Sequence, residues 1–180
     1  MKHALIFTAG VIGLAIGSLA SPTFAQTTAN GPYYAPPSWD QTLPAATRFI
    51  VLLNFASLAV LDRETGVVWE RSPQTFQQTW DAARLTCLSK TVVGRKGWRL
   101  PSITELTSLI DFSASSFPAF SAGHPFTDIQ FGSYWSATTD AFEPAIAWRV
   151  NFLDGAVGGG TKTTTRNVWC VRGTMTADAY

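Results

Sequence analysis

The sequence predicts one α+β domain, in which two helices pack on short antiparallel sheets with long loops. Three observations favour this fold class. Residues 72–90 carry an apolar stripe at helical spacing, residues 145–152 alternate as in a strand, and a segment rich in Ser, Phe, Pro and Gly at 111–132 separates them. The 180 residues suffice for one domain with one core and are few for two.

The first 25 residues are expected to be a signal peptide. Lys2 gives a positive start, residues 4–20 form an apolar run, and Thr23-Phe24-Ala25 has the pattern that a signal peptidase reads. An uncleaved membrane anchor is the alternative, but the run is short for a span and contains glycines. Gln26, rather than Cys, follows the expected cleavage point and argues against a lipid anchor. The sequence therefore predicts export to the periplasm, the cell surface or the exterior.

Three further segments follow the expected signal peptide. Residues 26–48 lack periodicity and predict a flexible arm, residues 49–174 the domain, and residues 175–180 a frayed tail. The chain has 13 basic and 12 acidic side chains, and loss of Lys2 balances them. This balance predicts no broad surface for nucleic acid or an anionic membrane. No other apolar run is long enough to span a membrane.

The first half of the domain reads as strands followed by a helix. Residues 49–53 predict a strand, and residues 57–61 and 67–70 predict a β-hairpin closed by a turn at Gly66. Pro73 suits the first turn of a helix, so we expect a helix from Ser72 to about residue 90. Its apolar stripe consists of Phe76, Trp80, Ala83 and Cys87.

The second half begins with a capping motif and ends in strands. Ser102 and Glu105 fit a capping box, which predicts a short helix with Ile103, Leu106 and Ile110 on one face. Strands are then expected at 134–138, 145–152, 157–160 and 167–172, with a turn at Asp154-Gly155. In the second of these strands the residues expected on one face are Ile146, Trp148, Val150 and Phe152.

The chain contains two cysteines, Cys87 and Cys170. In an oxidising compartment a disulfide is expected, and by chain entropy it stabilises the fold by about 4–4.5 kcal/mol. Two free buried thiols are the rival interpretation. The two cysteines with His124 do not make a zinc site, and we expect no cofactor.

Several motifs follow one another in a fixed order. They are Val60-Leu61-Asp62 with 66–69, Trp80-x-x-Ala83 with Cys87, 97–101 with Glu105-Leu106, 134–136, 147–152 with Gly155, and 170–172. In this order the chain resembles the DUF1566 family, that of the C-terminal domain of the Legionella collagen-like adhesin, over about residues 58–173. The resemblance implies a C-type-lectin-like fold related to formylglycine-generating enzymes. The collagen-like repeats of the adhesin are absent here, so its trimeric assembly is not implied.

Nine motif residues are expected to serve the structure. Large aromatic side chains bury area, and Arg99 can pair with a carboxylate such as Glu105. The alternative for Arg99 is contact with a ligand. The nine are Trp98, Arg99, Leu100, Pro101, Glu105, Trp135, Ser136, Trp148 and Arg172.

A binding role is the leading functional hypothesis. Arg149, Lys162 and Arg166, with Arg172, predict a basic patch on neighbouring strands, which suits sulfate or carboxylate groups of a glycan. The resemblance suggests sulfated glycosaminoglycans, and the other expected partner is an envelope or host protein. The loops expected to make contact are 112–133, 139–146 and 153–166.

Calcium binding and catalysis have weaker signals. Glu143, Asn151 and Asp154 offer oxygen ligands of the kind that calcium takes, in partial likeness to animal C-type lectins, although Asp154-Gly155 is typical of a turn. His124 is the lone histidine after residue 25, and familiar catalytic motifs are absent. The sequence therefore predicts a non-catalytic binding module. The alternatives are a structural envelope protein and a formylglycine-generating-type oxidase, which requires two reactive cysteines.

Overall fold

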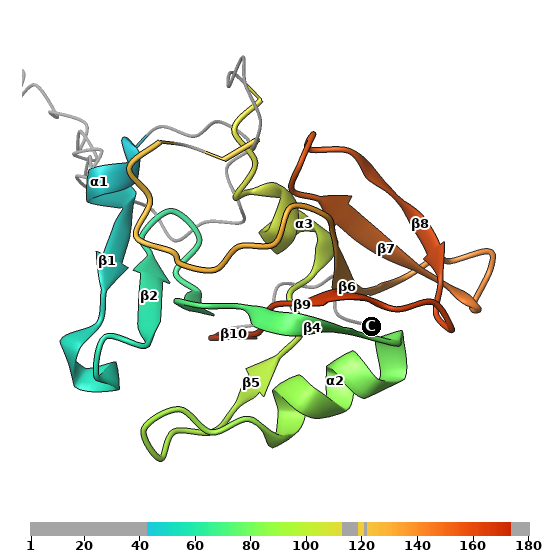
Figure 1. Cartoon of the computed structure of the whole chain (residues 1–180), viewed down its shortest axis with the longest axis horizontal. Helices are drawn as coiled ribbons and strands as arrows, with labels where there is room; N and C mark the ends of the chain where they lie inside the picture. The colour runs from blue at the N-terminus through green and yellow to red at the C-terminus, as the bar shows by residue number, and fades with distance from the viewer. Residues whose placement is uncertain (1–42, 113–118, 121, 174–180) are drawn as a thin grey trace, which may run out of the picture. The chain divides into compact units, whose positions relative to one another are not determined.

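A computed structural model of the chain describes residues 43–112, 119–120 and 122–173. This part is a mixed α+β structure, mostly β-sheet with a few short helices (Figure 1). The predicted signal peptide, most of the predicted arm and the predicted tail lie outside the described residues. None of the described helices is long and apolar enough to cross a membrane.

The first sheet confirms the predicted hairpin. Its strands pair antiparallel in the order β1-β2-β3-β10-β5. Val60 lies opposite Trp69, and Gly66 occupies the turn between them with a φ of 73°, a conformation that favours glycine. The strands are β1 (Phe49–Val51), β2 (Ala59–Asp62), β3 (Val68–Glu70), β10 (Val171–Arg172) and β5 (Trp98–Arg99).

The second sheet has the order β4-β9-β6-β7-β8. Strands β6 and β9 are parallel, and the other pairs are antiparallel. The single strand predicted at 167–172 is two strands, β9 and β10, which join different sheets. The strands of this sheet are β4 (Gln74–Gln78), β9 (Arg166–Val168), β6 (Ser133–Thr139), β7 (Ile146–Asn151) and β8 (Val157–Thr161).

The first long helix, α2 (Trp80–Ser89), begins later than predicted. Residues Gln74–Gln78 form strand β4 instead, and Phe76 is 53% exposed rather than on the buried stripe. A strand forms here instead of the first helical turns because β9 supplies backbone hydrogen-bond partners. Trp135 Nε1 also donates to the Gln78 carbonyl at 3.0 Å. The rest of the stripe is buried as predicted, at Trp80, Ala83 and Cys87.

The predicted capping box of helix α3 (Ile103–Thr107) is confirmed. Ser102 Oγ accepts the Glu105 N–H at 3.1 Å, and Glu105 Oε2 accepts the Ser102 N–H at 2.8 Å. Besides the strands β4 and β5, two further elements were not predicted. The helix α1 (Ala45–Arg48) lies before the expected domain start at 49, and a 3-10 turn, Leu53–Phe55, ends the first strand segment.

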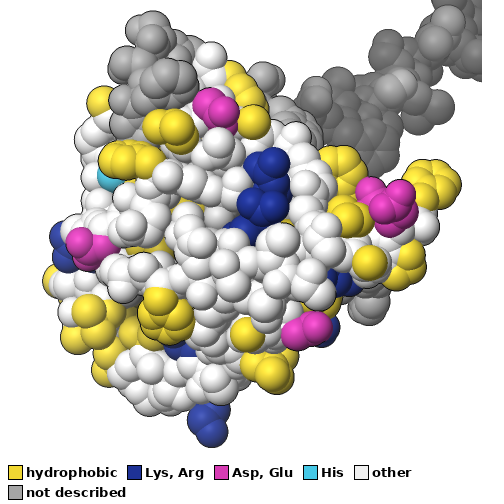
Figure 2. Space-filling model, turned by 45° about the vertical axis from the view of Figure 1, so that its right-hand side comes forward, with side chains coloured by type: hydrophobic (Ala, Val, Ile, Leu, Met, Phe, Trp, Pro, Cys, Tyr) yellow, Lys and Arg dark blue, Asp and Glu magenta, His cyan; other side chains and the backbone are white. Residues whose placement is uncertain are grey.

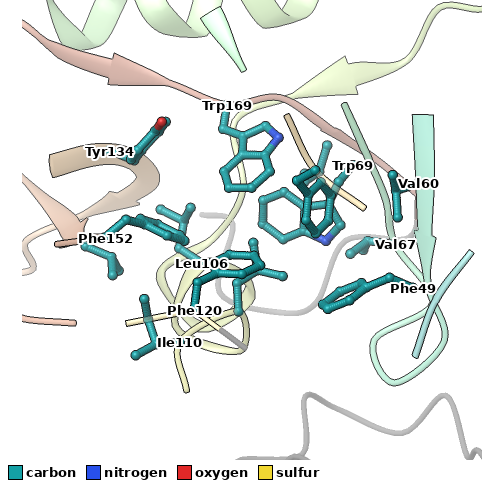
Figure 3. Packing of buried hydrophobic residues seen from close by; sticks show 14 of the residues in the cluster. Phe49, Val60, Val67, Trp69, Leu106, Ile110, Phe120, Tyr134, Phe152 and Trp169 are labelled. Carbon is teal, nitrogen blue, oxygen red and sulfur yellow. The ribbon is translucent and has the colours of Figure 1, made fainter. Parts of the chain in front are cut away.

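Two apolar clusters form the core, and strands run between them. Val168 and Cys170 point into one cluster with α2, whereas Trp169 and Val171 point into the other with α3. Figure 3 shows aromatic side chains gathered around Trp169 in the second of these clusters. Its ring centroid lies 5.2 Å from that of Trp69. Phe120 and Phe126, from the segment predicted to be a long loop, are part of this core.

Burial of Tyr134 predicts an unusual alkaline titration. Its hydroxyl accepts the Gln130 N–H at 2.7 Å, and burial raises the pKa of Tyr134 to about 12 from the ordinary 10.0. Because this folded-state pKa exceeds the unfolded one, the stabilisation it gives is complete below pH 10 and is lost as the pH rises through 12. An absorbance titration of tyrosinate should show one residue ionising late in native protein and normally in urea. Ionisation of all tyrosines near pH 10 in native protein would contradict this.

Candidate functional site

The predicted basic residue Arg149 lies in the second sheet and is half-buried. On β7 it is directly opposite Trp135 of β6 and Gly158 of β8. Residues directly opposite one another on paired strands project from the same face, so the three share one surface. Arg149 Nη1 donates to Ser133 Oγ at 2.8 Å. This bond fixes the guanidinium beside the glycine strand.

Arg166 reaches the same surface from β9. Its guanidinium carbon lies 5.1 Å from the centroid of the Trp135 ring, a cation–π contact. At Gly160 of β8 a Cβ atom would lie 2.8 Å from Arg166 Nη2, and at Gly158 it would lie 3.8 Å from Arg149 Nη2. Gly160 therefore leaves room that the Arg166 guanidinium needs, whereas a side chain at Gly158 would make only an ordinary van der Waals contact with Arg149. We call Arg149 and Arg166 the arginine pair, and we call Gly158 and Gly160 of β8, which lie beside them, the glycine floor.

The arginine pair carries uncompensated charge. Burial lowers the pKa of Arg166 from its ordinary value, and the positive charge of Arg149 lowers it further. In the described part of the chain neither arginine forms an ion pair with a carboxylate, and both Nε atoms are buried without a hydrogen-bond partner. Two like charges held close together and partly dehydrated favour the binding of an anion. Figure 2 shows basic side chains gathered in a patch, with acidic side chains lying apart from it.

Lys162, the third predicted basic residue, lies over a different ring. Its Nζ is 4.0 Å from the centroid of Trp80 and donates to Thr139 Oγ1 at 3.1 Å. Arg84 packs on the same indole at 4.7 Å. Arg84 was not predicted to belong to the site, although its spacing of four from Trp80 on a helix places the two side chains together.

Arg172, which the sequence analysis added to the patch, lies elsewhere. It is in β10 of the first sheet, and its Nε donates to the Lys96 carbonyl at 2.8 Å.

The motif residues expected to serve the structure are paired or buried. Arg99 and Glu105 form a two-pronged ion pair, with both N–O distances 2.7 Å. Five other motif residues, Trp98, Leu100, Pro101, Trp135 and Ser136, are buried.

Trp148 stays on the face predicted for β7 but is less buried than Val150 and Phe152. Val150 and Phe152 are buried in the cluster with α3, but Trp148 and Ile146 are only half-buried, and Ala147 is buried on the other side. The register between β6 and β7 shifts between Trp135 and Thr139. The extra residues lie in β6, where four positions span two of β7, so the alternation of β7 itself is unchanged.

The structure separates the calcium candidates. Glu143 precedes β7, whereas Asn151 and Asp154 follow or end it, so roughly 20 Å of strand lies between them. The Oδ1 atoms of Asn151 and Asp154 accept backbone N–H groups within their own turn, from Leu153 and Ala156. Among the described residues no cluster of three or more His, Cys, Asp or Glu side chains could hold a metal. These three residues therefore do not form one site.

The predicted disulfide is present between Cys87 and Cys170, whose Cα atoms are 5.4 Å apart. It occupies both thiols that an oxidase of the formylglycine-generating type would need. His124, predicted to lie in a loop, is half-buried against Phe120, with ring centroids 4.4 Å apart. Burial lowers the pKa of His124 from 6.5, so the neutral imidazole is favoured there.

Comparison with known families gives one finding. The family model described as the Lcl C-terminal domain matches residues 58–172, which is more than half of the chain. The match includes all three predicted basic residues, the glycine strand and both cysteines. A search of curated proteins gave no match.

Proposed function

We propose that this chain, which belongs to the Lcl C-terminal domain family, is an exported, non-catalytic, adhesin-like binding module that holds anionic groups of a glycan at the arginine pair. Family membership supports the adhesin-like role and the export. The C-type-lectin-like character of the scaffold, implied by the sequence motifs, is part of this proposal. The observation that carries it is the pairing of Arg149 and Arg166 over a glycine floor without a carboxylate among the described residues.

The chemistry of the arginine pair favours sulfate or carboxylate groups. A guanidinium offers a planar fork of N–H donors that matches two oxygens of such a group. An anion beside the two arginines would relieve their mutual repulsion. Binding is therefore stronger than the near-neutral charge of the chain suggests.

The surroundings of the arginine pair favour a chain of sugars over a single ion. Lys162 and Arg84 lie over Trp80, and Trp80 and Trp135 belong to the same core cluster. Lys162 and Arg84 therefore offer cations, besides the arginine pair, to further anionic groups along a polysaccharide. Because these side chains are partly exposed, added salt should weaken the binding.

The test is binding to dextran sulfate, with uncharged dextran as the reference polymer. The wild-type protein should bind the sulfated polymer, and the variant Arg149→Gln/Arg166→Gln should bind at least about 10-fold more weakly, because hydrogen bonds to charged groups contribute about 1.5–3 kcal/mol each. Titration calorimetry at low and physiological salt measures the difference. The melting temperature of the variant should not fall, because removal of two like charges relieves repulsion.

Arg63→Gln is the matched control for charge. Arg63 is a partly exposed arginine after β2, in the first sheet, and its Nη1 donates to the Thr47 carbonyl at 3.1 Å. This variant should bind dextran sulfate like wild type. Equal losses in the two variants would show nonspecific attraction, and the absence of binding by wild type to any sulfated or carboxylated glycan would favour a structural role in the envelope. Either outcome overturns the proposal.

A further inference from the structure

A second site lies in a cavity that the arginine pair does not touch. It has a volume of about 450 Å³, within the usual range for small-molecule sites. Four short segments form its walls, at residues 57–58, 70–72, 90–93 and 127. All of these residues are described by the structure. The cavity wall is more apolar than polar, with the apolar side chains of Leu58, Val92 and Val93.

Strained backbone is concentrated around this cavity. Within the described residues, four residues other than glycine have positive φ, namely Ala56, Ser57, Val93 and Asp128. Ser57 and Val93 line the cavity, and Ala56 and Asp128 are each adjacent in sequence to a lining residue. A β-branched residue such as Val93, with a φ of 49°, is a genuine outlier. Backbone strain of this kind is typical of ligand-binding positions, where the surrounding structure maintains it.

The polar groups of the cavity are mainly donors. The buried carboxylate of Glu70 is already satisfied, since its Oε1 accepts from Lys90 Nζ and Gln74, and its Oε2 accepts from the Cys170 N–H at 3.0 Å. Lys90 has three N–H donors and uses one on Glu70. Glu70 therefore offers little to a cationic ligand, whereas Lys90 retains donors for an anionic one.

Arg71 supplies the second cation. Its Nε donates to the Pro125 carbonyl at 3.0 Å and its Nη1 to the Ser57 carbonyl at 3.4 Å, so the side chain bridges two loops. Its Nη2 has no hydrogen-bond partner among the described residues. Among the lining residues, Arg71 and Lys90 are the two cations and Glu70 is the one carboxylate. Asp128, at the rim, accepts the Ser72 hydroxyl and lines the neighbouring pocket that contains His124.

We propose that this cavity binds a small aliphatic carboxylate, with its carboxylate held by Lys90 and Arg71 and its hydrocarbon chain packed on Leu58, Val92 and Val93. The spare donors of Lys90 and Arg71 match one carboxylate, and the apolar wall matches a hydrocarbon body rather than a sugar. The site differs from the arginine pair in both chemistry and residues. It therefore stands or fails independently of the glycan proposal.

The probe is hexanoate, added to the isotope-labelled full chain while amide chemical shifts are recorded. Acetate, which lacks the hydrocarbon body, and 1-hexanol, which lacks the charge, are the matched ligands. Hexanoate should shift the amides of residues that line the cavity and bind at least about 10-fold more tightly than either matched ligand. Shifts of equal size with 1-hexanol, or no localised shifts up to the solubility limit of hexanoate, overturn the proposal.

Two variants connect these shifts to the cavity. Leu58→Glu adds a negative charge to its wall at a side chain that is 56% exposed, and it should weaken hexanoate binding at least about 10-fold. Leu85→Glu, on α2 and 66% exposed, does not line the cavity and should bind like wild type. Val93→Gly removes an apolar contact while relieving strain, so binding should fall without a lower melting temperature. Unchanged binding in Leu58→Glu, or equal loss in Leu85→Glu, rejects the site.

Discussion

Replacement of Arg48 by Met should lower the free energy of unfolding by about 3–5 kcal/mol, because it leaves two buried carboxylates without their cation. Arg48 binds Asp62 through two bonds of 2.9 and 2.7 Å, and its Nη1 lies 3.0 Å from Glu64 Oε2. All three residues are buried. Urea unfolding followed by tryptophan fluorescence measures the change. The loss is large beside the 5–15 kcal/mol by which domains are usually stable.

The control for this substitution is Arg63→Met. Arg63 is also close to the β2–β3 turn but is only half-buried and forms no ion pair within the described residues. Its replacement should change the free energy of unfolding by no more than about 0.5 kcal/mol. If Arg48→Met proved equally mild, residues 45–48 would behave as the flexible arm that the sequence predicts rather than as part of the fold.

Local signals predicted local structure well. The capping box at Ser102 and the turn at Gly66 involve neighbours in sequence, and both form as expected. The predicted start of the first helix was wrong. Strand β9, which pairs with Gln74–Gln78, lies some 90 residues away, so the residues near Pro73 carry no sequence signal of that pairing. The role of Arg48 was missed for the same reason. Its acidic partners follow it by 14 and 16 positions and lie across the β1–β2 hairpin.

The candidate site was predicted in part. Arg149 and Arg166 were identified as basic residues on neighbouring strands, and the parallel pairing of β6 with β9 brings them to one surface. The sequence did not reveal why β8 is rich in glycine, because the reasons are contacts with other strands: Gly160 lies against Arg166, and Gly159 lies against Ile146. The sequence also did not indicate that Phe120 would belong to the core, because a segment without hydrophobic periodicity does not show which of its side chains are buried.

Removal of the disulfide by Cys87→Ala/Cys170→Ala should lower the free energy of unfolding by about 4 kcal/mol. The bond closes a sequence separation of 83 residues and joins α2 to the segment between β9 and β10. Without it the unfolded chain gains conformational freedom, and this gain in entropy is the main cost. Both cysteines are completely buried, so the smaller alanine side chains also lose some packing. Urea unfolding of the oxidised wild type and the variant measures the difference.

The slope of the unfolding curve separates the two causes of this loss. If the disulfide acts mainly on the unfolded state, the variant unfolds to a more expanded chain, exposes more surface and shows a larger m-value. Wild-type protein reduced with dithiothreitol should match the variant in both midpoint and slope. A loss of stability at unchanged slope would instead place the effect in the native packing around α2. An unchanged midpoint would show that the two strands and α2 stay together without the covalent link.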